Sequence, residues 1–123
     1  MHHLAIWRSI ARMGTNRFTT FEQFWPFYLQ EHARPLTRAL HYVGTSLVFI
    51  IAAFALASGN LWWLFAMPLA GYFFAWLAHF TVEKNRPATF TYPGWSLRAD
   101  FQMYFMWLTG RLGPELRKAG VAG

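Results

Sequence analysis

The chain contains no cysteine, which excludes disulfide bonds, thiolate nucleophiles and cysteine-based zinc sites. A metal would have to bind histidine, aspartate or glutamate, ligands that suit iron, manganese or zinc. Charge is also scarce, because only 13% of the residues are charged, against about 25% in ordinary soluble proteins. Since 55% of the 123 residues are hydrophobic and a small soluble domain buries a limited fraction of its surface, we predict a single membrane domain over residues 1–123.

The few charges are mostly basic, and the formal net charge is +6. In so apolar a chain we expect this charge to meet the headgroups of membrane lipid, with no nucleic acid as partner. The N-terminal stretch MHHLAIWRSIARMG has neither the sustained apolar core nor the cleavage site of a signal peptide. We interpret it as a basic amphipathic segment lying on the bilayer, with His2 and His3 in solvent.

Two long apolar runs predict transmembrane helices at residues 39–58 and 61–82, each with one histidine and no formal charge. Each run has roughly the 20 residues that a helix needs to cross a bilayer. Only Gly59 and Asn60 separate them, a pair typical of a tight turn. The alternative, two buried helices of a soluble bundle, leaves too little polar surface to cover them. The expected fold is all-α, an integral membrane helical hairpin.

The basic residues predict the orientation of this hairpin. All eleven lysines and arginines flank the two runs, and the connecting turn has none. The positive-inside bias then places both termini in the cytoplasm. We expect an integral protein of a bacterial-type inner membrane or of the endoplasmic reticulum.

Amphipathic helices are expected on either side of the hairpin, at residues 20–33 and 97–112. Thr19 with Glu22, or Thr20 with Gln23, has the spacing of a capping box at the start of the first. Ser96 is placed to cap the second.

Three histidines are predicted to meet at the open end of the hairpin. His41 and His79 lie at nearly equal distances from the turn, so an antiparallel hairpin brings them to similar heights. His32 is nine residues before His41, on the opposite face of an unbroken helix, but Pro35 between them favours a bend and a new helix start. Glu83 is one helical turn beyond His79. A metal is the simplest partner for several neutral imidazoles, although a single interfacial histidine is more often a hydrogen-bonded anchor.

The loop NRPATFTYPGW after the second run adds candidate substrate-binding residues. Arg86 could grip a carboxylate through paired hydrogen bonds, or simply extend to the membrane surface from a proline-rich connector. Arg38, at the same interface, could do likewise or meet lipid phosphate. Asp100 is open to three interpretations: a favourable charge near a helix start, a partner of a histidine or a further metal ligand.

The stretches FYLQEHARPLTRALHYVGTSL and HFTVEKNRPATFTYPGWSLRADFQM resemble the small membrane proteins typified by the fungal 2-hydroxy fatty acid dioxygenase. The resemblance runs from about Phe18 to Leu112, and the block EKNRPA, with a histidine four residues before its glutamate, is its most specific part. It implies an iron(II)-dependent step of fatty acid α-oxidation, in which O2 is consumed and a 2-hydroxy fatty acid loses its carboxyl carbon.

The resemblance assigns the iron(II) ligands to His32, His41 and His79. Glu83 matches the family glutamate, and we interpret it as a fourth ligand or a base, with Arg86 as the second candidate catalytic residue. Arg38, Asn85 and Arg86 are candidates for binding the substrate's head. Two alternatives remain open: a zinc-dependent lipid hydrolase with Glu83 as general base, and a non-catalytic membrane adaptor or haem-binding protein.

Overall fold

The computed structural model describes residues 18–121, and all the regular structure in this part of the chain is helical. The predicted N-terminal surface segment lies outside the described residues. The elements, in chain order, are α2 (Phe21–Gln30), α3 (Pro35–Ser58), the short 3-10 helix η1 (Leu61–Phe65), α4 (Ala66–Leu77), the π-helix η2 (Ala78–Glu83), the 3-10 turn η3 (Ala88–Phe90), α5 (Pro93–Leu108) and α6 (Leu112–Lys118).

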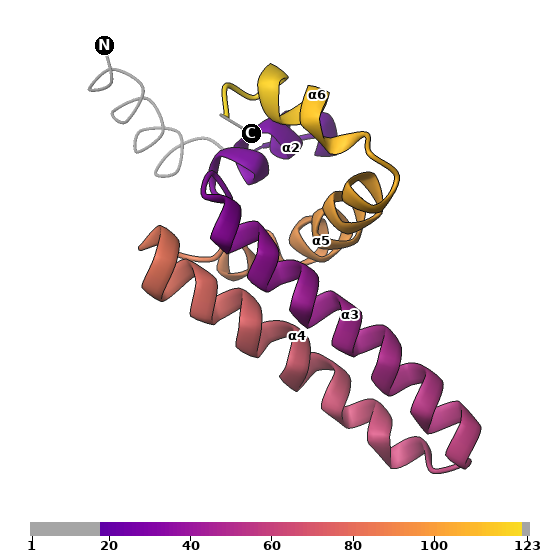
Figure 1. Cartoon of the computed structure of the whole chain (residues 1–123). Helices are drawn as coiled ribbons and strands as arrows, with labels where there is room; N and C mark the ends of the chain where they lie inside the picture. Colours follow the sequence, from indigo (N-terminus) through magenta and orange to yellow (C-terminus); the bar gives the residue numbers. More distant parts are fainter. Residues whose placement is uncertain (1–17, 122–123) are drawn as a thin grey trace.

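The predicted hairpin is present: α3 runs antiparallel to the unit formed by η1, α4 and η2 (Figure 1). Gly59 ends α3 with φ of 71°, a left-handed conformation that glycine adopts without strain. Asn60 then caps the next helix by accepting a hydrogen bond from the backbone N–H of Trp62 at 3.2 Å. The helices approach closely at Gly44, where an added Cβ would lie 3.1 Å from Cβ of Phe74.

Both arms of the hairpin are long and apolar enough to cross a membrane. Residues Pro35–Ser58 have a mean hydropathy of 2.0 and residues Leu61–Glu83 a mean hydropathy of 1.5. Their side chains mostly face outward, including exposed tryptophans at the turn, Trp62 and Trp63. An outward apolar surface on this scale is what lipid covers in a membrane protein.

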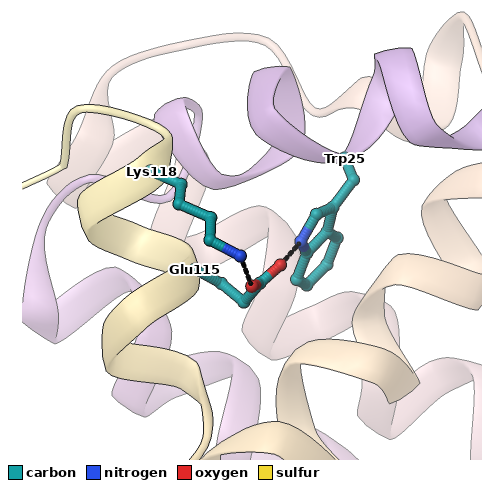
Figure 2. Close-up of polar contacts among 3 residues, drawn as sticks. All are labelled: Trp25, Glu115 and Lys118. Carbon is teal, nitrogen blue, oxygen red and sulfur yellow. Dashed lines mark hydrogen bonds and ion pairs between the residues drawn. The ribbon is translucent and has the colours of Figure 1, made fainter.

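The hydrophobic core lies beside the hairpin, where α2, α5 and α6 pack together (Figure 1). On α2 the buried positions recur with helical spacing, which identifies an amphipathic helix: Phe21, Phe24, Trp25, Tyr28 and Leu29. Figure 2 shows how α6 is attached: the indole Nε1 of Trp25 donates to Glu115 at 2.9 Å, and Lys118 forms an ion pair with the same carboxylate at 3.3 Å.

Several boundaries differ from those expected. The first flanking helix covers Phe21–Gln30 and the second covers Pro93–Leu108, while the first arm begins at Pro35. Thr20 is the cap of α2, because its hydroxyl accepts from the N–H of Gln23, so the second of the two proposed capping pairs is the one used. The assignment of Ser96 as a cap is wrong: α5 begins at Pro93, a residue favoured in the first helical turn, and Ser96 lies inside the helix.

Candidate functional site

Three histidines from three segments meet at the open end of the hairpin. His32 follows α2, His41 lies in α3 and His79 lies in the π-helix η2. Nε2 of His32 is 3.0 Å from Nε2 of His41 and 3.0 Å from Nε2 of His79. All three side chains are buried, with 1%, 6% and 2% of their surface exposed.

The opposite ring nitrogens determine the tautomer of each imidazole. Nδ1 of His32 lies 2.6 Å from the carbonyl oxygen of Tyr28, and Nδ1 of His41 lies 3.0 Å from that of Thr37. Nδ1 of His79 lies 2.6 Å from Oδ1 of Asn85, whose orientation is set because its Nδ2 donates to the carbonyl of Glu31 at 3.1 Å. Each of these oxygens only accepts, so in a neutral ring the proton sits on Nδ1.

The three Nε2 atoms therefore face one another as bare lone pairs. Burial, followed by the neighbouring His41 and His79, holds the pKa of His32 well below its ordinary value, so this ring does not supply a proton. Lone pairs at this separation repel unless a cation lies among them. Two nitrogens bound at about 2.1 Å to one metal ion lie about 3.0–3.4 Å apart, depending on geometry, which matches the two separations of 3.0 Å measured from His32. All three ligand atoms lie within 4.8 Å of one another. The cluster could thus hold a metal ion.

The chain around Pro35 explains why His32 reaches the hairpin. Pro35 occupies the first turn of α3, and the preceding residue, Arg34, is extended. Arg38 holds this bend, because its Nη1 donates to the carbonyls of His32 at 2.7 Å and Ala33 at 3.0 Å. His32 is thereby turned back over the end of α3, as the proline suggested.

A second bend positions His79. The π-helix ends at Lys84, which has a positive φ of 60° and lies in the left-handed region. The chain folds back there, so the N–H of Asn85 donates to the carbonyl of His79 at 2.9 Å while the Asn85 side chain meets the His79 ring. Metal-binding histidines commonly donate their second nitrogen to such a partner, and the role of Asn85 was not expected from the sequence.

The other predicted residues lie around the cluster rather than in it. Glu83 accepts hydrogen bonds from the N–H of Arg34 at 3.0 Å and from the hydroxyl of Thr37. Its carboxylate therefore binds polar groups at the start of α3. Arg86 is exposed, and its guanidinium carbon lies 5.2 Å from the centre of the Phe90 ring. Phe90 packs in turn on Trp76, which lines the histidine site.

Two adjoining cavities lead to the histidines. A small one, of about 10 Å³, is lined by the three histidines together with Tyr28, Ser96 and Asp100. A larger groove of about 320 Å³ lies between α3, α4 and α5, and its walls are mostly apolar, with Val48, Met67, Leu97 and Phe101 among them. His41, Ala75 and Asp100 line both. A wider hollow of about 440 Å³ at the hairpin turn, lined by Gly59–Asn60 and Leu61, Trp62 and Phe65, has no titratable side chain.

Tyr28 and Asp100 form a polar pair at the junction of these cavities. The Tyr28 hydroxyl donates a short hydrogen bond to Asp100, and the Tyr28 ring stacks on His32 with centroids 4.1 Å apart. Burial raises the pKa of Asp100 to about 7. Tyr28 precedes His32 by one helical turn, a spacing that could have identified it from the sequence.

The family described as 2-hydroxy-palmitic acid dioxygenase Mpo1-like matches residues 18–112. The chain belongs to the Mpo1-like family. The match covers the hairpin, all three histidines, and Ser96 and Asp100 of α5, and the family's description implies a dioxygenase of a 2-hydroxy fatty acid. No curated protein and no solved structure matches the chain.

Proposed function

We propose that this Mpo1-like chain is an integral membrane, iron(II)-dependent dioxygenase that shortens 2-hydroxy fatty acids by their carboxyl carbon. The observation that carries the proposal is the convergence of three Nε2 lone pairs in a buried cluster that adjoins an apolar groove. A polar, metal-binding site next to an apolar groove suits an amphiphile with a chelating head and an alkyl tail.

His32, His41 and His79 would hold the metal. Iron(II) bound there would supply the redox chemistry that the reaction with O2 requires, and three imidazoles leave coordination positions open. Glu83 is a less suitable ligand than the sequence suggested, because its carboxylate already accepts two hydrogen bonds from the start of α3. We keep it as a support of the bend that carries His32.

The chain's own residues would orient the substrate. The groove between α3, α4 and α5 would receive the alkyl tail, because the apolar walls of this groove exclude water. The head would lie where the groove meets the small cavity beside the histidines, because at about 10 Å³ that cavity has room for little more than one oxygen atom. Arg86, linked to that cavity through Phe90 and Trp76, would pair with the carboxylate at its mouth, whereas Arg38 and Asn85 hold the histidine-bearing bends.

The membrane setting follows from the hairpin. Its two apolar arms have only 17% and 6% of their most apolar stretch buried inside the chain, so lipid would cover the rest. The basic residues lie at or beyond the open ends of both arms and are absent from the turn, which would place the histidine end on the cytoplasmic side.

Two alternatives are weaker on this geometry. A haem between paired histidines needs room for a porphyrin, and Nε2 atoms 3.0 Å apart leave none. A zinc hydrolase would use the same three histidines, but it needs a base beside bound water, and Glu83 is engaged elsewhere.

The test is turnover by protein purified without a histidine tag and loaded with iron(II) under anaerobic conditions. With 2-hydroxypalmitate we expect one O2 consumed for each fifteen-carbon acid formed, with carbon dioxide and water as the other products. His41→Ala should abolish both metal binding and turnover. Protein that contains one iron per chain but turns over no 2-hydroxy acid would refute the proposal, and activity with zinc alone, without O2, would favour the hydrolase.

A further inference from the structure

One buried polar atom near the cluster lacks a partner. The hydroxyl of Ser96 is the single buried side-chain polar atom without a hydrogen-bond partner among residues 18–121, and Ser96 is 2% exposed. Ser96 also lines the small cavity with the three histidines. A buried hydroxyl left unpaired is unfavourable, and its position indicates that a molecule entering this cavity supplies the partner.

Asp100 lies one helical turn beyond Ser96, so the two side chains occupy the same face of α5. Asp100 lines both the small cavity and the apolar groove. Its one side-chain hydrogen bond among the described residues comes from Tyr28, to Oδ1, which leaves the other carboxyl oxygen available to a ligand.

Tyr28 fixes the position of this carboxyl group. Its side chain is 1% exposed and its ring lies between two others, stacked on Trp25 at 5.7 Å and on His32 at 4.1 Å. Asp100 is therefore a fixed acceptor, and Ser96 is a free donor one turn away, both beside the three histidines where the groove meets the small cavity.

We infer that Ser96 and Asp100 recognise the hydroxyl group on the second carbon of the substrate, with Ser96 donating to that oxygen and Asp100 accepting from it. The inference rests on the proposed function and names the residues that distinguish a 2-hydroxy fatty acid from one without the hydroxyl. A fatty acid without the hydroxyl leaves both buried groups unpaired, and sites built to bond a substrate hydroxyl reject analogues that lack it.

The test compares the binding of 2-hydroxypalmitate and of palmitate by isothermal titration calorimetry in detergent, for the metal-free and the iron-loaded protein. Ser96→Ala should reduce the preference for the hydroxylated acid about threefold to tenfold, and Asp100→Asn about tenfold or more. Ser46→Ala, which removes a hydroxyl bonded to Tyr104 outside both cavities, is the matched control and should leave the preference unchanged.

The outcomes separate this inference from the proposed function. An unchanged preference in Ser96→Ala and Asp100→Asn, in variants that retain the wild-type Tm and metal content, refutes hydroxyl recognition even if the wild type turns over. If Asp100→Asn does not fold, Ser96→Ala decides. Wild-type protein that binds both acids equally also refutes it. A preference that depends on both residues, in a protein without turnover, supports hydroxyl recognition and refutes the dioxygenase.

Discussion

Removing the side chain of Asn85 tests whether the metal site depends on the tautomer of His79. Asn85 accepts from Nδ1 of His79 at 2.6 Å and donates to the carbonyl of Glu31 at 3.1 Å. In Asn85→Ala nothing holds the proton on Nδ1, so the ring can carry it on Nε2 and present no lone pair to a metal. Loss of such a partner typically lowers metal affinity about 10- to 100-fold, equivalent to about 1.4–2.8 kcal/mol.

The assay is anaerobic titration of metal-free protein with iron(II), followed by metal analysis of protein washed at several free-iron concentrations. Asn85→Asp distinguishes the effect of the His79 tautomer on iron binding from a general loss of stability. A carboxylate still accepts from Nδ1 of His79, so we expect near wild-type iron affinity. It cannot donate to the carbonyl of Glu31, so we expect a lower Tm. Asn60→Ala, at the distant hairpin turn, is the matched control and should retain iron.

An iron affinity in Asn85→Ala within twofold of wild type would refute the reasoning. An equal loss of affinity in Asn85→Ala and Asn85→Asp would show that the hydrogen bond to Glu31, rather than the tautomer, matters.

Three further substitutions test other contacts. Glu83→Ala removes the acceptor at the start of α3, so we expect a stability loss of about 1–3 kcal/mol with metal content retained. Metal lost without any loss of stability would instead make Glu83 a ligand. Gly44→Leu, at the close approach of the helices, should destabilise by about 1–3 kcal/mol in thermal unfolding, whereas Gly94→Ala, in open space, should not. Glu115→Gln should cost about 0.5–1 kcal/mol at neutral pH relative to Glu22→Gln. The hydrogen bond from the Trp25 indole lowers the pKa of Glu115 from 4.5. The stabilisation by the Glu115 carboxylate is therefore complete above pH 4.5 and is lost as the pH falls through the lowered pKa. A stability difference between Glu115→Gln and wild type that persists in acid would contradict this.

The hairpin and the meeting of the histidines were accessible to sequence reasoning, because both depend on simple counting. The length of the apolar runs, the Gly59–Asn60 turn and the bend at Pro35 are local features, and antiparallel packing then sets the heights of His41 and His79. The structure has each of these features.

The surroundings of the histidines were less accessible. Counting in α-helical turns placed Glu83 on the face of His79, but residues Ala78–Glu83 form a π-helix, whose wider turn changes the direction of every later side chain. Nothing local in the sequence marks that turn. The interpretation of Ser96 as a cap failed for a related reason, since Pro93 begins α5 one turn earlier. The contact of Tyr28 with Asp100 depends on how α2 packs on α5, which a single sequence does not specify.

The histidine cluster also has a mechanical consequence. A metal ion bound by His32 and His79 would cross-link positions 47 residues apart, in a chain that has no cysteine to do so. Free metal at 1,000 times its dissociation constant would add about 4.1 kcal/mol to the folded state. Metal starvation would therefore loosen the joint between the apolar hairpin and the helices beside it, and would expose that joint to proteases before any catalytic residue is altered.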